Sequence, residues 1–345
     1  MQDIALVEVT RGPAVESLHH GALVVMDGEG RTVLALGDVE RVLFPRSCVK
    51  ILQALPLVES GIADKLGLSP SELCLCCASH NGEERHRAGA LSLLRKVGLG
   101  EDDLECGTQW PAREADVAAL HRAGDKPGRI YNNCSGKHAG FVCMACESGW
   151  DPKGYSGIDH PLQQRLARVM SEVTGAPHDA RNAAIDGCSI PTYAIALTAL
   201  ARGFARIASG SGLDATRSAA ARRLMAACQS DPFMIAGTER FCTRAMEAYG
   251  DRIFVKTGAE GVFCAALPTL GLGVALKARD GTTRAAEAAM AGVIAALLGA
   301  STPQEAAVLD NFRNAPVTDR TGVRAGTIAL APDLARPLEA LSRLS

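Results

Sequence analysis

The sequence has few aromatic residues, no long apolar run and almost no net charge. Phe, Trp and Tyr make up 4% of its 345 residues, so the core must be built mainly from the aliphatic residues within its 47% hydrophobic content. No stretch approaches the roughly 18 consecutive apolar residues that a membrane-spanning helix requires. The 36 Lys and Arg are balanced by 38 Asp and Glu, a net charge of −2. We therefore expect neither a membrane span nor a nucleic-acid partner.

The beginning of the sequence also lacks the features of an export signal. No basic stretch precedes an apolar one, and an acid, Asp3, already stands at the third position. Twelve cysteines in a chain without such a signal are expected to be reduced thiols, because disulfides are rare in the cytosol. These features predict a cytoplasmic protein.

Strand patterns lie near both ends of the sequence, and helical patterns lie between them. Apolar runs punctuated by glycine predict strands at 22–26, 32–36, 252–255, 261–267, 273–279 and 323–330. Apolar residues at helical spacing predict helices at 48–61, 88–97, 161–173, 191–201, 218–228 and 284–298. This order predicts an α+β fold (an α/β sandwich), in which both chain ends build one antiparallel sheet and a helical region is inserted. The sheet-containing part is expected at 1–65 and 250–345 and the mainly helical part at 66–249, although one continuous domain of 1–345 also fits the pattern.

Ser47 and Lys50 form a Ser-x-x-Lys pair at the start of a predicted helix. Three residues along a helix advance by about 300° and about 4.5 Å, so the two side chains lie on one face. A serine hydroxyl becomes a useful nucleophile when a base lies within reach, and a deprotonated lysine can be that base. Taken alone the pair is better explained as a helix cap followed by a solvated lysine.

Two further short motifs stand at the polar ends of apolar runs. Ser-His-Asn at 79–81 follows the run 73–78, which we interpret as a buried strand, and Lys-Thr-Gly at 256–258 follows the predicted strand 252–255. Each is weak by itself, and a loop with an Asn-Gly turn explains the first. In this order, however, Ser-x-x-Lys, Ser-x-Asn and Lys-Thr-Gly resemble the three elements of serine β-lactamases and penicillin-binding proteins.

Together the three motifs predict a serine hydrolase that acts on an amide or on another acyl compound. Ser47 would attack, Lys50 and Ser79 would pass on its proton, and Lys256 would assist. Ser47 and Ser79 are separated by only 32 residues, which leaves almost no room for a helical domain between the first two motifs. For that reason penicillin is not the favoured substrate.

A second group of polar residues lies in the helical middle of the sequence. Cys134 belongs to a glycine-rich polar stretch with Lys137 and His138, and Cys188 lies in a second polar turn with Asp186. Two thiolates and a nitrogen donor would suit zinc if the two stretches met in space. The spacing by itself favours the alternative, which is two buried cysteines in glycine-rich turns.

Five segments of the sequence together resemble the L-asparaginase II family of the rhizobial type. The segments are 44–50, 78–83, 132–138, 186–191 and 255–261. The resemblance covers almost the whole chain and implies a fold like that of the serine β-lactamases and penicillin-binding proteins. It also implies a homodimeric amidohydrolase that converts L-asparagine to L-aspartate and ammonia.

The resemblance assigns roles to particular residues. It implies that Ser47 is the nucleophile and that its catalytic partners are Lys50, Ser79 and Lys256. It implies a zinc site formed by Cys134, Lys137 and Cys188. Since the reaction needs no Lewis acid once Ser47 is activated, we expect the metal to organise the pocket and to tune affinity.

Free asparagine carries an ammonium and a carboxylate, and each charge requires a partner in the binding pocket. Asp186 is the candidate for the ammonium and Arg46 the candidate for the carboxylate. Asn81 and Thr257, which lie within the motifs, are expected to contact the substrate as well. 

Other functions fit parts of the same pattern. Within the enzymes, a glutaminase or a hydrolase like the β-lactamases and D-Ala peptidases is the alternative. A protein that kept the fold but only binds zinc or an amino acid is the alternative outside the enzymes. The presence of all four predicted catalytic residues favours an enzyme.

Overall fold

The computed structural model of the chain describes residues 2–343. The chain divides into two compact units. The first comprises Met1–Cys48, Ala196–Ser209 and Arg244–Ser345, and the second comprises Val49–Ile195 and Gly210–Thr243. Within the described residues, no helix has both the length and the apolar character that crossing a membrane would require.

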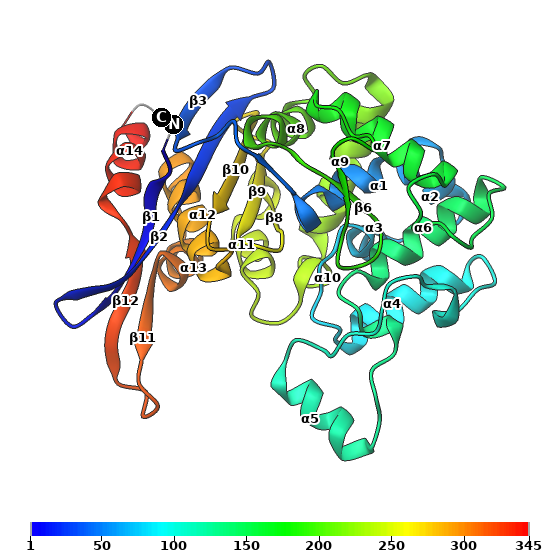
Figure 1. Cartoon of the computed structure of the whole chain (residues 1–345), viewed down its shortest axis with the longest axis horizontal. Helices are drawn as coiled ribbons and strands as arrows, with labels where there is room; N and C mark the ends of the chain where they lie inside the picture. The colour runs from blue at the N-terminus through cyan, green and yellow to red at the C-terminus, as the bar shows by residue number, and fades with distance from the viewer. Residues whose placement is uncertain (1, 344–345) are drawn as a thin grey trace. The chain divides into compact units, whose positions relative to one another are not determined.

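The first unit contains an antiparallel sheet to which both ends of the chain contribute (Figure 1). Its strands are β1 (Ile4–Arg11), β2 (Ala14–Asp27), β3 (Thr32–Leu36), β8 (Phe254–Thr257), β9 (Val262–Leu267), β10 (Leu272–Ala278), β11 (Asn314–Thr318) and β12 (Arg324–Leu330). They run in the order β11-β12-β1-β2-β10-β9-β8, with β3 paired to β2 outside this path. Val25 of β2 stands opposite Val274 of β10, so an N-terminal strand and a C-terminal strand meet in the sheet. The predicted fold class, an antiparallel sheet from both chain ends with helices inserted, is confirmed.

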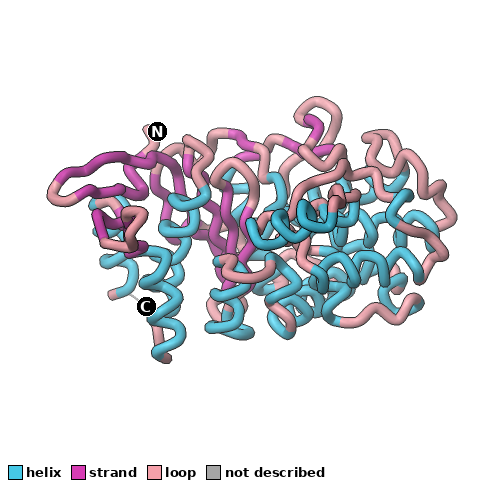
Figure 2. Tube along the Cα trace, turned by 90° about the horizontal axis from the view of Figure 1, so that it is seen from below, coloured by secondary structure: helices cyan, strands magenta, loops and turns pink. Residues whose placement is uncertain are grey.

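Helices pack against this sheet within the first unit (Figure 2). They are α8 (Leu197–Ser209), α12 (Thr283–Leu298), α13 (Pro303–Arg313) and α14 (Pro332–Ser342), with the short elements β4 (Val42–Leu43) and η4 (Gly250–Arg252). Helix α8 lies against β2, β9 and β10. It comes so close that a Cβ atom on Gly273 of β10 would lie 2.2 Å from the backbone oxygen of Ala201. A glycine in the strand is therefore what permits this close packing.

The second unit consists mainly of helices. They are α1 (Lys50–Glu59), α2 (Ile62–Lys65), α3 (Pro70–Cys76), α4 (Glu84–Arg95), α5 (Glu114–Ala123), α6 (Ser135–Glu147), α7 (Pro161–Thr174), α9 (Ala215–Ser230) and α10 (Phe233–Ala236). Short elements are η2 (Glu101–Asp103), η3 (Arg129–Tyr131), β5 (Ala183–Ile185) and β6 (Pro191–Tyr193). Helix α6 is buried along its first three turns, polar residues included, so it forms the centre of the unit. Around it, α3 and α4 pack on α6, while α7 and α9 pack on α1.

Three elements span a boundary between the units, so that each contains residues of both. They are η1 (Arg46–Val49), β7 (Ile195–Ala196) and α11 (Phe241–Tyr249). Relative to the predicted boundaries near 65 and 250, the units divide after Cys48 and after Thr243. Helix α8 belongs with the sheet because it packs on β10, whereas α1 belongs with the helices because it packs on α7 and α9.

The interpretation of 73–78 as a buried strand is wrong. Most of this run lies in helix α3, which begins with Pro70 in its first turn. Ser69 caps the helix: its hydroxyl accepts from the Glu72 N–H, and the Glu72 carboxylate accepts from the Ser69 N–H. A capping box and an N-terminal proline start a helix even where the following residues are continuously apolar.

The helix expected at 191–201 is also partly wrong. Its first half forms the short strands β6 and β7, and helix α8 begins only at Leu197. β6 pairs with β5, so the backbone of Pro191 lies opposite Ile185 in a small hairpin. This non-local pairing outweighs the helical spacing of the apolar residues.

Candidate active site

In the first unit, the turn that carries Ser47 lies beside the strand that carries the Lys-Thr-Gly motif. The Cys48 thiol donates a hydrogen bond to the backbone oxygen of Lys256 at 3.3 Å. Gly258 follows that strand, and a Cβ there would lie 2.9 Å from Cys48 Sγ. The residue before the serine, Arg46, has a left-handed φ of 50°, which is unusual for a residue other than glycine. Ser47 is thus held on a turn whose backbone is fixed against β8, and it is only partly buried.

Lys256 and Thr257 end strand β8. The Lys256 side chain is 1% exposed, and its Nζ donates to the backbone oxygen of Thr257 at 2.9 Å. Lys256 stands opposite Cys264 of β9, which fixes its place in the sheet. The Lys256 amine is thus held at the end of β8, on the same unit as Ser47.

In the second unit, the structure brings Lys50 and Ser79 together. Lys50 begins helix α1 and is 1% exposed. Its Nζ lies 2.9 Å from Ser79 Oγ, 2.5 Å from the backbone oxygen of Ala78 and 3.0 Å from Cys134 Sγ. The amine therefore contacts a hydroxyl, a carbonyl and a sulfur, which places it between the Ser-x-Asn motif and the cysteine stretch.

The segment that carries Ser79 is fixed by backbone hydrogen bonds to other parts of the second unit. The N–H groups of Ser79 and Asn81 donate to the carbonyls of Ile235 and Ala236, both at 2.9 Å. The N–H between them donates to Asn133 at 3.2 Å. The motif is thus an extended segment after helix α3 and is paired on both sides, so that its side chains have defined positions.

The two cysteine stretches also meet in space. Cys134 immediately precedes helix α6, and Lys137 lies in the first turn of that helix. Lys137 Nζ is 3.0 Å from Cys188 Sγ, and the two cysteine side chains are hydrogen-bonded to each other. Asp186 Oδ2 lies 3.5 Å from Cys188 Sγ. The residues predicted to hold a metal therefore lie side by side, although 54 residues separate the two cysteines in the sequence.

The pKa values of the two cysteines in this cluster are shifted in opposite directions. The hydrogen bond from Cys188, together with the positive charges of Lys50 and Lys137, holds the pKa of the Cys134 thiol well below its usual value despite burial. The same hydrogen bond, together with burial, raises the pKa of the Cys188 thiol. Burial acts to lower the pKa of Lys137, but the charges of Cys188 and Cys134 outweigh it and the pKa is raised. The shifts thus favour the thiolate at Cys134 over that at Cys188, and the protonated form of Lys137.

The chemistry of these donors fits zinc with one condition. Within residues 2–343, no three side chains of His, Cys, Asp or Glu converge as a metal site. The third donor next to Cys134 and Cys188 is instead the Lys137 amine, which must lose its proton before it can bind. Cys134, Cys188 and Lys137 would thus supply two sulfurs and one nitrogen to a zinc ion.

His138 follows Lys137 in the sequence but takes a different role. Its Nδ1 lies 2.7 Å from the Tyr155 hydroxyl, which also accepts from the Glu105 N–H at 2.8 Å. Burial, reinforced by the charges of Lys137 and Lys50, keeps the pKa of His138 well below its usual value. The imidazole is therefore neutral and is a structural partner of Tyr155.

The side chain of Asn81 is fully engaged with protein groups. It is 2% exposed. Its Oδ1 accepts from Arg240 Nη1 at 3.0 Å, and its Nδ2 donates to Glu83 Oε1 at 3.1 Å and to the Thr238 carbonyl at 3.2 Å. Glu83 and Arg240 thus belong to this network, although no sequence motif assigns either of them a role. Glu83 stands two residues after the Ser-x-Asn motif, but no pattern in the sequence marks Arg240.

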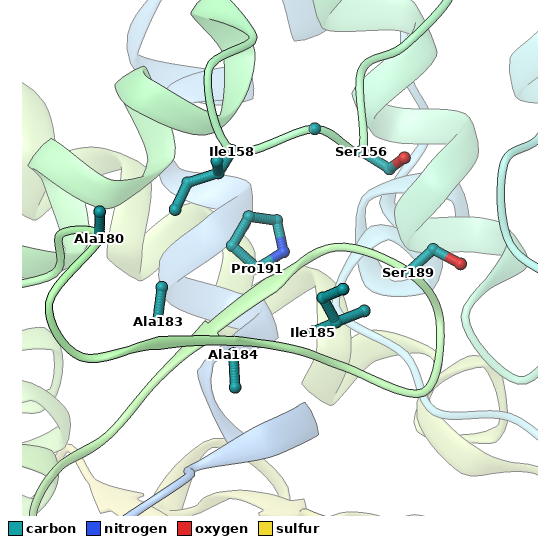
Figure 3. A pocket seen from close by; sticks show the side chains of 9 residues that line it. Ser156, Ile158, Ala180, Ala183, Ala184, Ile185, Ser189 and Pro191 are labelled. Atoms are coloured by element: carbon teal, nitrogen blue, oxygen red, sulfur yellow. The ribbon is translucent and has the colours of Figure 1, made fainter.

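A cavity of about 370 Å³ opens in the second unit next to the 186–190 turn (Figure 3). Its lining is mainly aliphatic, with Ile158, Ile185 and Pro191, and the hydroxyls of Ser156 and Ser189 lie at one side. None of the lining residues carries a charge. A zwitterionic ligand needs charged partners, so this cavity does not suit one.

Comparison with known proteins places the chain in a family. A family model described as L-asparaginase II matches residues 7–330. No curated protein matches the chain. Among solved structures, a β-lactamase from Mycobacterium bovis is similar at 16% identity and a TM-score of 0.41, covering 80% of this chain and 94% of that one. A protein from Bacteroides dorei assigned to the β-lactamases is similar at 14% identity and a TM-score of 0.36, covering 75% of this chain and 84% of that one. These structural likenesses are distant and add nothing to the family match.

Proposed function

Because the chain belongs to the L-asparaginase II family, we propose that it hydrolyses L-asparagine to L-aspartate and ammonia. The family makes it an amidohydrolase. The observation that supports a serine mechanism is the buried Lys50 amine, 2.9 Å from Ser79 Oγ and only three residues after Ser47 in the chain. A base, a second hydroxyl and a candidate nucleophile are the parts that acyl transfer to serine requires.

In the first half of the proposed reaction, Ser47 Oγ forms a bond to the side-chain amide carbon of asparagine. Lys50, in its deprotonated amine form and with Ser79 as relay, takes the proton of the Ser47 hydroxyl and then supplies a proton to the leaving nitrogen. The C–N bond breaks, ammonia departs, and the β-aspartyl group remains as an ester on Ser47. Lys256 supports the charge that develops on the carbonyl oxygen.

In the second half, water replaces the nitrogen. The same Lys50 and Ser79 pair takes a proton from water as its oxygen attacks the ester carbon, and returns that proton to Ser47 Oγ as the ester bond breaks. The products are L-aspartate and the original serine hydroxyl. One water is consumed, and one ammonia is released.

The experiment that tests this function is ammonia release by the purified protein. L-asparagine, L-glutamine and a chromogenic β-lactam are offered separately under the same conditions. We expect turnover of L-asparagine with the highest kcat/KM. A higher kcat/KM for glutamine would make the protein a glutaminase, and hydrolysis of the β-lactam alone would make it a β-lactamase-like enzyme. Tight binding of asparagine without ammonia release would show a binding protein.

We further propose a zinc ion held by Cys134, Lys137 and Cys188. Bound there, zinc would supply positive charge and would order the pocket for the substrate. Lys137 and Cys188 would give up their protons to bind it, whereas the lowered pKa of Cys134 favours the thiolate form that zinc requires. The cluster is 4% exposed or less at each of these residues, so the ion would also be shielded from water.

Zinc affinity is expected to rise with pH, by about 100-fold per pH unit, because two protons leave and each contributes about tenfold. Competition with a chromophoric chelator between pH 6 and 8 measures it. Lys137→Met removes one of the two protons and should reduce the slope to about tenfold per unit. Cys143→Ser is the matched control, since Cys143 is a buried thiol on the same helix outside the cluster. An affinity independent of pH would contradict the proposed ligands.

Asp186, Arg46 and Thr257 are proposed as substrate contacts, with Asp186 facing the ammonium. Asp186 follows β5 in the turn that also holds Cys188, and its carboxylate lies 3.5 Å from Cys188 Sγ. Asp186→Ala should raise the KM for L-asparagine by roughly 10- to 100-fold, because a charge-assisted contact is lost from substrate and transition state alike. Steady-state kinetics of Asp186→Ala test this contact. An unchanged KM, or a loss confined to kcat, would show that Asp186 does not bind the substrate ammonium.

A homodimer and a cytoplasmic location complete the proposal. The dimer is implied by the family resemblance, and the location by the twelve cysteines, none of which forms a disulfide within residues 2–343. Light scattering of the purified protein measures the oligomeric state, and a monomer at working concentration would contradict the first of these two points.

A further inference from the structure

Arg240 carries a positive charge that forms an ion pair with no acid of residues 2–343. In the part of the chain that the structure describes, its guanidinium makes one side-chain hydrogen bond, from Nη1 to Asn81 Oδ1 at 3.0 Å, and no ion pair. A guanidinium has five N–H donors, so most of those of Arg240 have no protein acceptor. The residue is partly buried, where an unpaired charge is less well solvated than at an open surface.

The buried acid of the same network, Glu83, is occupied by other partners. Its Oε1 accepts from Asn81 Nδ2 at 3.1 Å and from the Thr238 N–H at 2.8 Å. Its Oε2 accepts from the Thr238 hydroxyl at 2.6 Å and from Arg113 Nη1 at 2.9 Å. Burial acts to raise the pKa of Glu83, but the hydrogen bonds from Thr238 and Asn81 outweigh it and the pKa is lowered. Glu83 is therefore an anion that forms its ion pair with Arg113, and it forms none with Arg240.

The turn that leads to Arg240 is held in a strained conformation. Gly237 has a φ of 105°, and a Cβ on it would lie 2.4 Å from Glu83 Oε1. Glu239, which is not a glycine, has a left-handed φ of 64°. Such backbone persists only where surrounding contacts impose it, and it is concentrated at ligand-binding and catalytic sites. Here Glu83 imposes it through Thr238, and the turn brings Arg240 back to Asn81.

This turn is attached directly to the segment of Ser79. The carbonyls of Ile235 and Ala236, just before the turn, accept from the N–H groups of Ser79 and Asn81. Arg240 then contacts the Asn81 side chain, two residues from Ser79. The Arg240 guanidinium is thus held next to the Ser-x-Asn motif in two ways. The backbone before its turn is hydrogen-bonded to the backbone of the motif, and its side chain is hydrogen-bonded to the Asn81 side chain.

We propose that Arg240 binds the α-carboxylate of the amino-acid substrate and so determines specificity for free amino acids. This assignment rests on the proposed function. One N–H of Arg240 holds Asn81, while the others present the planar fork that pairs with a carboxylate through two parallel hydrogen bonds. Asn81 acts as a positioning residue, because Glu83 and Thr238 orient its amide so that Oδ1 faces Arg240.

The test compares two amides that differ in the carboxylate. L-asparagine has it, and 3-aminopropanamide has the same amine and amide without it. For Arg240→Met we expect the KM for L-asparagine to rise roughly 10- to 100-fold, with kcat within a few-fold of the wild type. The inhibition constant of 3-aminopropanamide against L-asparagine should not change. Arg240→Lys keeps the charge and should recover part of the loss.

Two control variants separate this role from a structural one. Arg85→Met removes an exposed arginine of the same unit that pairs with Asp231 and should leave both constants unchanged. Arg46→Met tests the other arginine proposed for the carboxylate. If Arg46→Met abolishes the discrimination between the two amides while Arg240→Met preserves it, the assignment of Arg240 is overturned. Equal weakening of both ligands by Arg240→Met would likewise overturn it, since a purely structural defect acts on both.

Calorimetry distinguishes failure of this assignment from failure of the proposed function. Wild-type protein is titrated with L-aspartate, the product, which carries the same α-carboxylate. We expect binding that Arg240→Met weakens by the same factor as the KM. Unchanged aspartate affinity in Arg240→Met would overturn the role of Arg240 alone. No binding of aspartate and no turnover of asparagine in the wild type would overturn the proposed function, and this assignment with it.

Discussion

Ser47→Ala is expected to abolish ammonia release from L-asparagine, lowering kcat by roughly 10⁴-fold or more, as loss of a covalent nucleophile does. The side chain is partly buried on the turn 46–49, and the alanine keeps the Cys48 contact to Lys256 that holds this turn. The unfolding midpoint should therefore stay within a few degrees of the wild type. Steady-state ammonia release and thermal unfolding measure the two effects.

Two serine variants control for this result. Ser60→Ala changes an exposed serine just after helix α1 and should leave kcat unchanged. Ser79→Ala removes the proposed relay, which lies 2.9 Å from Lys50, and should lower kcat less than Ser47→Ala does. If Ser79→Ala were the inactive variant and Ser47→Ala retained turnover, Ser79 would be the nucleophile. Activity in both variants would exclude a serine mechanism based on these motifs.

Lys50→Met is expected to lower kcat by roughly 10³-fold, because proton transfer by a positioned base contributes on the order of 10²- to 10⁴-fold. Methionine has a similar length and suits the buried position. The substitution removes the amine from Ser79, from the Ala78 carbonyl and from Cys134. Steady-state kinetics with L-asparagine measure the expected fall in kcat.

The same substitution has a second consequence that does not depend on catalysis. Lys50 is one of the charges that lower the pKa of the Cys134 thiol, so its loss should raise that pKa and reduce the thiolate fraction at a given pH. Thiolate absorbance followed through a pH titration of the zinc-free protein measures this shift. Lys65→Met is the matched control, since Lys65 is an exposed lysine of the same unit that pairs with Glu147. An unchanged thiolate titration in Lys50→Met would contradict the contact between Lys50 and Cys134.

Much of the fold follows from local patterns in the sequence. The glycine-rich turn at 27–30 joins β2 to β3, as the flanking apolar runs predict. Helices α7 and α12 lie within a residue of the predicted 161–173 and 284–298 at each end. Such elements depend on turn chemistry and on the spacing of apolar residues, which are properties of neighbouring residues. The interpretation of 73–78 as a strand was wrong because a continuous apolar run fits a buried strand and a buried helix equally well. The signal that decides for a helix is the cap formed by Ser69 and Glu72, which lies before the run.

The sequence by itself determined the class of fold, the ordered motifs and the family they resemble. Only the tertiary structure decided which of these residues meet. Lys50 contacts Ser79 and Cys134, and Lys137 contacts Cys188, across separations of 29, 84 and 51 residues. Arg240 reaches Asn81 across 159 residues. Contacts of this kind depend on how helices and turns pack, and packing is set by the whole core, so no local pattern in the sequence contains them.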